Sequence, residues 1–344
     1  MAPSKSIEMQ PLREGLGTIF LRSQFCTKPQ WPPTSTDLSE KVAIVTGSNI
    51  GLGFYSCIHL LSFKLSHLIL AVRSVKKGED AASKLRAQNP KAKIEVWELD
   101  MESYDSVQAF TRRVETDLTR LDIAILNAGI VNQEFSLNTK TGHEEIIQVN
   151  YLSTMLLAVL LLPALKTKSP VGSPGRLTIV NSGLAYGAKF PNRDRNPLLP
   201  SFDDTTLFPW DANERYSCSK LMCQLFFVKM MTYIEADSVI VNLVDPGLCK
   251  GSGLHRNVKG IVSGAMALMK SASGRTLAEG SSTYVDAAVV KGKESHGCFV
   301  FDWNIMPFPN MVYDSESQAV IDKLWIETLK EFEFAGVQSI LQNL

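Results

Sequence analysis

Seven short apolar runs, separated by longer stretches of helical periodicity, constrain the fold of this chain more than any other feature. The runs are rich in β-branched residues and cover 41–47, 67–73, 93–100, 121–129, 176–182, 238–247 and 297–302. Nearly continuous apolar runs of this length predict strands buried on both faces, and the stretches between them are long enough for crossover helices. The series therefore predicts an α/β Rossmann fold, a doubly wound parallel sheet of seven strands with helices on both faces.

The same rhythm sets the domain organisation. Residues 1–38 precede it and end in the proline-rich "KPQWPPTSTD", so we expect an N-terminal extension followed by one domain over 39–344. The most apolar run, Tyr151–Leu165, is shorter than the roughly 20 residues that a membrane span needs, which favours a buried helix. The first residues lack the pattern of a secretory signal, and we expect a cytoplasmic protein.

Charge and cysteine usage exclude other classes. The chain has 35 basic and 35 acidic residues, so no overall field favours binding to nucleic acid. Its six cysteines form no C-x-x-C pair and have no histidine at metal-ligand spacing. We expect free thiols in a reducing compartment, without a disulfide framework or a metal site.

The end of the first run carries a glycine-rich turn, "TGSNIGLG", Thr46–Gly53. Gly47 allows a tight turn out of the strand, Gly51 allows the backbone to approach a pyrophosphate, and Gly53 allows the following helix to pack closely. Freed backbone N–H groups and the positive helix end then bind phosphates. A glycine cluster at a strand-to-helix junction predicts a dinucleotide site.

The end of the second run distinguishes the two nicotinamide cofactors. An acidic residue there would bind the ribose of NAD, but this chain has "AVRSVKK", with Arg73 and no carboxylate at the strand end. A guanidinium binds a 2′-phosphate in bidentate fashion, which favours NADP(H). The alternative is that Arg73 is a solvated loop residue.

A candidate catalytic group follows. Tyr216 and Lys220 lie four residues apart in "RYSCSKL" and share a face if the segment is helical. A nearby ammonium group would lower the phenol pKa from about 10 toward neutrality, which suits proton transfer to a carbonyl. Ser182, at the end of the fifth run, would stabilise the substrate oxygen. Asn150, in an apolar helix, is either a structural hydrogen-bonding residue or holds a water in a proton relay.

Together these motifs resemble the short-chain dehydrogenase/reductase family over about residues 40–302. The matching segments are "TGSNIGLG", "LNAG" at 126–129, "VN" at 149–150, Ser182, "YSCSK" and "DPG" at 245–247. The resemblance implies a catalytic tetrad of Asn150, Ser182, Tyr216 and Lys220. It also implies cofactor contacts from Gly47, Ser48, Asn49, Gly51, Leu52, Gly53, Arg73, Asp100, Asn127, Ala128, Gly129, Tyr216, Lys220, Pro246, Gly247 and Leu248. By this resemblance Asp100 would contact the adenine, Lys220 the nicotinamide ribose, and the Leu248 backbone the carboxamide. The chain is most similar to the retinol-dehydrogenase-type branch and its fungal relatives of secondary metabolism, most of which prefer NADP(H).

Three segments are expected to shape the substrate site. The long insertion between Ser182 and Tyr216 is rich in aromatics, namely Phe190, Phe202, Phe208 and Trp210. By resemblance, 248–273 and 302–314 would flank the same cleft. All three are apolar with sparse charge, which favours an apolar small-molecule carbonyl or alcohol as substrate. The alternative is that these residues simply pack the loops.

We therefore expect an NADP(H)-dependent oxidoreductase that interconverts a carbonyl and an alcohol, in secondary-metabolite biosynthesis. One alternative is a non-catalytic NADP(H)-binding scaffold or redox sensor. Another is a membrane-associated reductase anchored by its N-terminus or by 259–270, although neither segment is long enough to span a membrane. The apolar helix from Tyr151 would suit a homodimer interface, and it would equally suit burial against the sheet.

Overall fold

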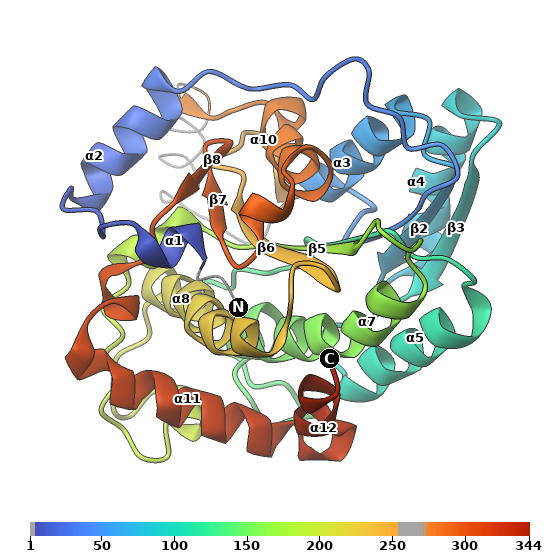
Figure 1. Ribbon diagram of the computed structural model, residues 1–344. Helices are drawn as coiled ribbons and strands as arrows, with labels where there is room; N and C mark the ends of the chain where they lie inside the picture. Colours follow the sequence, from blue (N-terminus) through green and yellow to red (C-terminus); the bar gives the residue numbers. More distant parts are fainter. Residues whose placement is uncertain (1–3, 254–270, 272) are drawn as a thin grey trace.

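The computed structural model describes residues 4–253, 271 and 273–344, and its centre is one sheet in the order β3-β2-β1-β4-β5-β6-β7-β8 (Figure 1). The strands are β1 Val42–Thr46, β2 His67–Val72, β3 Lys93–Glu98, β4 Ile123–Leu126, β5 Gly175–Val180, β6 Val239–Asp245, β7 Phe299–Phe301 and β8 Asn304–Met306. Strands β1 to β7 pair in parallel, and each coincides with one of the seven apolar runs. The predicted doubly wound fold is confirmed.

The sheet has one strand more than predicted. β8 pairs antiparallel with β7 through a turn at Asp302 and Trp303, whose φ angles are +53° and +58°. Two successive residues in the left-handed region form the turn that suits the twist of a two-residue hairpin. β8 is short and its residues are half-buried or exposed, so it lacks the continuous apolar run that identifies the other strands.

The strand order reverses at β1, which pairs with β2 on one side and β4 on the other. In open parallel sheets, ligands bind in the crevice outside the carboxyl ends of the strands at such a reversal. The topology therefore places the glycine-rich turn that follows β1 at the centre of the expected site.

Helices cover both faces of the sheet, as Figure 1 shows. The helices are α3 Gly51–Ser62, α4 Val75–Gln88, α5 Tyr104–Asp117, α6 Glu145–Ile147, α7 Thr154–Thr167, α8 Ala212–Met230, α10 Leu277–Val285, α11 Gln318–Glu331 and α12 Val337–Gln342. One hydrophobic core lies between the sheet and α3, α4 and α10, and a larger one lies between the sheet and α5, α7 and α8. α11 packs on α8 and α12 on α7, which adds an outer layer on that side.

The apolar helix predicted around Tyr151–Leu165 is buried, as expected. α6 and α7 are joined by a π-helical turn, Gln148–Ser153, into one helical stretch. Among the described residues, Glu145–Thr167 is the one helix long and apolar enough to cross a membrane, but 89% of its apolar window is buried inside the protein. α5 and α12 cover it, so the second alternative, burial within the chain, accounts for its composition.

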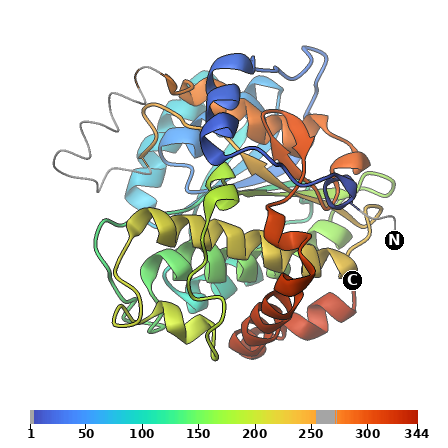
Figure 2. The same ribbon diagram turned by 90° about the vertical axis from the view of Figure 1, so that its left-hand side faces the viewer.

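Residues 4–38 are packed along the domain. α1, Lys5–Glu8, lies against β8, where Ser6 Oγ donates to the Met306 carbonyl at 2.6 Å and accepts from the Phe299 N–H at 3.0 Å. α2, Leu16–Leu21, continues into a π-helical turn, Arg22–Cys26. α2 contacts the 3₁₀ turn at Gly183–Gly187. Figure 2 shows α2 on the outside of the domain on the side turned to the viewer.

Candidate active site

The glycine-rich turn has the conformation that its sequence predicts. Gly47 and Gly51 both have φ of +62°, a backbone angle that residues other than glycine rarely adopt. A Cβ at Gly53 would lie 2.5 Å from Asn127 Nδ2 and 2.7 Å from the Gly47 carbonyl oxygen. Asn127 Nδ2 donates to the Thr46 carbonyl at 2.9 Å, which holds the loop after β4 against the turn. Glycine at 53 therefore allows α3 to begin directly against two strand ends.

A cavity of about 1170 Å³ follows the carboxyl ends of the strands and begins at this turn. Its lining includes most of the predicted cofactor residues, namely Gly47, Asn49, Gly51, Leu52, Arg73, Asp100, Asn127, Ala128, Gly129, Tyr216, Lys220, Pro246, Gly247 and Leu248. Ser48 and Gly53 lie behind this lining: both are buried, and Ser48 Oγ donates to the Val45 carbonyl at 2.8 Å. These two residues shape the turn from within.

One end of the cavity is strongly charged. Arg73 forms an ion pair with Glu102, and the Asp100 carboxylate accepts from Lys140 Nζ at 2.8 Å. The Arg73 side chain remains 59% exposed. Lys77, in the first turns of α4, lines the same end and adds a second cation. This end has the charge pattern that a 2′-phosphate would need, provided that the phosphate displaces Glu102 from Arg73.

The other end holds Ser182, Tyr216 and Lys220. Ser182 follows β5, and its hydroxyl accepts from the Leu184 N–H at 3.2 Å. Tyr216 and Lys220 project from α8, which Asp211 caps through bonds to two backbone N–H groups. Their residues are only 8% and 5% exposed, respectively. Three of the four tetrad positions therefore converge in the cavity.

Asn150, the fourth position, lies behind the cavity in the π-helical turn and is fully buried. Its Oδ1 accepts from the Ile130 N–H and its Nδ2 donates to the Ile130 carbonyl, both at 2.9 Å. Nδ2 also lies 3.2 Å from Ser219 Oγ. Both ends of the amide are thus bonded to protein groups, and a role for this residue in a proton relay stays a prediction.

A neighbouring amide, Asn181, contributes positioning that the sequence reading missed. Its Oδ1 accepts from the Ser182 N–H at 2.8 Å and from Gln224 Nε2 at 2.8 Å. Its Nδ2 donates to the Lys220 carbonyl at 3.1 Å. Asn181 therefore fixes the end of β5 against α8, and with it the place of Ser182 relative to Tyr216.

The electrostatics differ from the expectation that Lys220 lowers the pKa of Tyr216. Burial raises the pKa of Tyr216 well above its ordinary value, the charge of Asp245 raises it further, and a hydrogen bond with Ser182 opposes the change. Lys220 Nζ lies 5.7 Å from the Tyr216 ring centroid and donates to the Val180 carbonyl at 3.0 Å. Burial also lowers the pKa of Lys220. In this structure desolvation dominates both groups, and the expected lowering is wrong.

Asp245 is a further charged group that the sequence reading did not single out. It ends β6, lines the cavity and is 4% exposed. Burial and the negative charge of Asp302 raise the pKa of its carboxyl to about 7, against the opposing effects of Arg275 and two backbone N–H groups. The motif "DPG" therefore places a titratable acid beside the candidate catalytic residues.

The walls of the cavity correct the expected substrate segments. Phe190 and Phe202 are buried in the core with ring centroids 5.9 Å apart, and neither lines the cavity. Phe208 lies under Arg195, and Trp210 donates to the Gln133 carbonyl at 2.6 Å. The alternative, that these aromatics pack the loops, is what the structure shows.

The insertion does contribute other residues to the lining, namely Gly183, Leu184, Gly187, Lys189, Asp211, Asn213 and Glu214, and the other two expected segments contribute unequally. None of residues 302–314 lines the cavity, and its lining there ends at Phe301. From 248–273, Leu248, Cys249, Ser252 and Gly253 line it, while 254–270 and 272 lie outside the described residues, as does the suggested anchor at 259–270. The sequence reading missed six lining residues from the N-terminal extension: Leu16, Gly17, Ile19, Phe20, Ser23 and Gln24.

Comparisons with known proteins agree with this geometry. A family model described as "short chain dehydrogenase" matches residues 41–190. The short chain dehydrogenase/reductase mfmJ of Annulohypoxylon moriforme is 58% identical over 94% of both chains. The short chain dehydrogenase virL of Hypocrea virens is 41% identical over 99% of both chains.

Solved structures show the same fold at low identity. Salutaridine reductase from Papaver somniferum is 21% identical with a TM-score of 0.58, over 76% of this chain and 99% of that one. NADPH-bound carbonyl reductase from chicken fatty liver is 18% identical with a TM-score of 0.57, over 78% and 99%. The strand-end serine, the tyrosine–lysine pair and the glycine-rich turn line one cavity. Together with the fungal relatives at 58% and 41% identity, this shows that the chain belongs to the short-chain dehydrogenase/reductase family.

Proposed function

We propose that the protein is an NADP(H)-dependent oxidoreductase that interconverts a carbonyl and an alcohol on an apolar small molecule of fungal secondary metabolism. The observation that carries this proposal is the convergence of Ser182, Tyr216 and Lys220 in the cavity that begins at the glycine-rich turn. The fungal origin of its relatives supports the biological setting.

The residues fit a dinucleotide. Gly47 and Gly51 have positive φ angles and carry no side chain, so the turn leaves its backbone open to a pyrophosphate. The cavity continues from this turn to Arg73 at one end and Tyr216 at the other. When bound, a nicotinamide cofactor would supply the hydride for reduction of the carbonyl, or take it up in oxidation of the alcohol. The Arg73 guanidinium and the Lys77 ammonium would hold the 2′-phosphate.

Tyr216 supplies the proton. Its raised pKa keeps the phenol protonated at neutral pH, so it can donate a proton to the carbonyl oxygen as the carbon gains hydride. The Ser182 hydroxyl donates a hydrogen bond to the same oxygen and stabilises its developing charge. The Lys220 ammonium then stabilises the tyrosinate until solvent reprotonates it.

The test is Tyr216→Phe, with Tyr233→Phe at an exposed tyrosine beyond α8 as the control. Loss of the general acid should lower NADPH consumption about 10²- to 10⁴-fold across a panel of apolar aldehydes, ketones and quinones. The dissociation constant of NADPH should stay unchanged in both variants. A non-catalytic scaffold, in contrast, would show no NADPH consumption in the wild type, and Tyr216→Phe would change nothing.

Cofactor choice has its own test, Arg73→Asp, with Lys84→Asp on the exposed far part of α4 as a control of equal charge change. Arg73→Asp should weaken NADPH binding much more than NADH binding, because the guanidinium would contact the 2′-phosphate, which NADH lacks. Equal losses for the two cofactors would reject the NADP(H) assignment.

A further inference from the structure

One face of the N-terminal helix forms part of the cavity wall. Leu16, Ile19, Phe20 and Ser23 line the cavity, and their spacing of three, four and seven residues places them on one side of a helix. Leu21, on the opposite side, is 57% exposed and does not line the cavity. The extension therefore presents three apolar side chains to the site.

This wall lies at the catalytic end of the cavity. A Cβ on Gly187, in the 3₁₀ turn that begins after Ser182, would lie only 2.7 Å from Leu16 Cδ2. At the other end of the wall, a Cβ on Gly247 would lie 2.8 Å from the amide end of the Gln24 side chain. The segment 16–24 thus bridges the turn after β5, which follows Ser182, and the loop after β6.

Gln24 also covers the backbone of Leu248. With its amide rotated so that both ends are satisfied, Gln24 donates to the Leu248 carbonyl and accepts from the Leu248 N–H, both at 3.1 Å. The family resemblance assigns that same backbone to the nicotinamide carboxamide. The N-terminal segment therefore reaches the boundary between the substrate and cofactor parts of the site.

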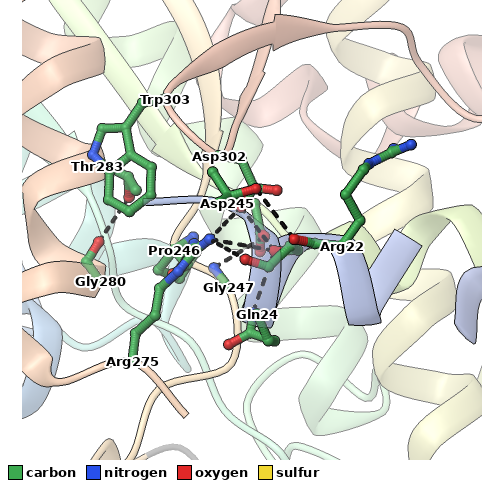
Figure 3. A network of polar contacts seen from close by, with 12 residues as sticks. Arg22, Gln24, Asp245, Pro246, Gly247, Arg275, Gly280, Thr283, Asp302 and Trp303 are labelled. Carbon is green, nitrogen blue, oxygen red and sulfur yellow. Dashed lines mark hydrogen bonds and ion pairs between the residues drawn. The ribbon is translucent and has the colours of Figure 1, made fainter. Parts of the chain in front are cut away.

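A buried ion pair holds the wall in place (Figure 3). Arg275 Nη2 donates to the Ser23 carbonyl at 3.0 Å and bonds the Asp302 carboxylate, and Nη1 donates to the Pro246 carbonyl at 3.0 Å. Ser23 Oγ donates to Asp302 Oδ1 at 2.7 Å. The guanidinium also lies 4.6 Å from the Trp303 ring centroid. Ser23, Arg275 and Asp302 are all buried, so these bonds are shielded from water.

We propose that residues 16–24 form a substrate-selecting wall, in which Leu16, Ile19 and Phe20 contact the apolar skeleton of the substrate. This inference rests on the proposed function and specifies how its site distinguishes substrates. Phe20 is the principal contact: it is the largest side chain of the face, and it is half-buried beside the cavity. Ser23 and Gln24 are positioning residues, which hold that face toward the site.

The experiment compares Phe20→Ala with Leu21→Ala, the adjacent residue on the outer face of the same helix. The probe is 9,10-phenanthrenequinone, a three-ring apolar diketone, titrated against the full-length protein saturated with NADP⁺ and followed by tryptophan fluorescence. Phe20→Ala should raise the quinone dissociation constant about tenfold, and Leu21→Ala should change it by less than about twofold. In turnover with NADPH, Phe20→Ala should raise KM more than it changes kcat. Phe20→Leu, a smaller change in volume, should give an intermediate dissociation constant and covers the case in which Phe20→Ala does not fold.

The outcomes separate this inference from the proposed function. If the wild type binds NADPH and the quinone but never oxidises NADPH, the proposed function fails while the binding comparison still tests the wall. If Phe20→Ala binds the quinone as the wild type does, the wall plays no part in recognition and the inference is overturned. It is also overturned if the wild type does not bind the quinone, or if Phe20→Ala weakens NADPH as much as the quinone, since the segment would then act on the cofactor loop.

Discussion

Asp245 offers a sharp test of the electrostatics of this site, because its charge can be removed with little change in shape. The carboxyl ends β6, is 4% exposed, and accepts from the Gly247 N–H at 3.0 Å. Asparagine can accept the same bond. We therefore expect Asp245→Asn to retain the loop geometry and to remove the titration of a group whose pKa is raised to about 7.

The magnitude follows from proton linkage. The pKa rises from 3.8 to about 7 on folding, so between these values the folded protein holds a proton that the unfolded chain has lost. The wild type therefore loses stability as the pH rises through this window, and it loses nothing further above it. Between about pH 5 and pH 8.5 the loss amounts to roughly 3 kcal/mol, at about 1.4 kcal/mol for each pH unit below 7. Asp245→Asn carries no such penalty, so its stability relative to the wild type should increase by that amount over the same interval.

The assay is urea unfolding followed by tryptophan fluorescence at both pH values, with similar m-values required for the comparison. Asp194→Asn, at a side chain that is 86% exposed, is the control. Its free energy of unfolding should differ from that of the wild type by the same amount at both pH values, to within about 0.5 kcal/mol. A constant stability difference between Asp245→Asn and the wild type at both pH values would refute the reasoning. Because the charge of Asp245 also raises the pKa of Tyr216, the limb of the pH–rate profile that Tyr216 controls should move to lower pH in this variant.

Three further expectations concern other parts of the molecule. Burial opposes the charge of His143, but Asp203 and Glu331 outweigh it and raise its pKa from 6.5 to about 9. His143→Gln should therefore lower the free energy of unfolding by about 3 kcal/mol near pH 6, measured by urea unfolding, and this difference should vanish as the pH rises through about 9. Gly53→Ala should destabilise the protein by about 1–3 kcal/mol and weaken NADPH binding, because the added Cβ would lie 2.5 Å from Asn127 Nδ2. The control is Gly15→Ala, whose Cβ would have no atom within 4 Å and which should therefore leave stability nearly unchanged. Wild-type NADPH affinity in Gly53→Ala would contradict the packing argument. With α7 covered by α12 and α8 by α11, light scattering should give the mass of one chain, and twice that mass would contradict the inference that these helices are unavailable for pairing.

Local sequence predicted the fold because the physical signal is local. Six of the seven strands are buried along nearly their whole length, and such strands are mostly apolar, whereas the edge strand β3 is partly exposed. The glycine-rich turn was equally predictable, since φ of +62° at Gly47 and Gly51 favours glycine. β8 was not predicted, because its three half-buried or exposed residues form no periodic pattern.

The substrate walls were predicted only in part, because apolar composition does not distinguish a cleft from a core. Phe190 and Phe202 are apolar, as residues that contact an apolar substrate would be, yet they pack against each other beneath the surface. The lining residues within 16–24, which no prediction included, lie in a segment whose helical stripe is too short to stand out. Its position depends on Ser23, Arg275 and Asp302, residues separated by as much as 279 positions in the chain. The sign of the Tyr216 pKa change was missed for the same reason, because burial is a property of the folded structure.

The use of an ion pair to hold this wall has a geometric reason. An apolar contact would tolerate rotation or sliding of a short helix, whereas the bonds from Arg275 to the Ser23 carbonyl, the Pro246 carbonyl and the Asp302 carboxylate are directional. Rotation by one residue, about 100° on a helix, would replace Phe20 with Leu21 on the face toward the cavity. A buried ion pair contributes little net stability over apolar packing, but separating its partners leaves a buried charge without compensation. Any other rotation of the helix that broke these bonds would therefore be unfavourable. Because Arg275 binds the loop after β6 as well as Ser23, the register of the wall is set by the same loop that ends the candidate cofactor site.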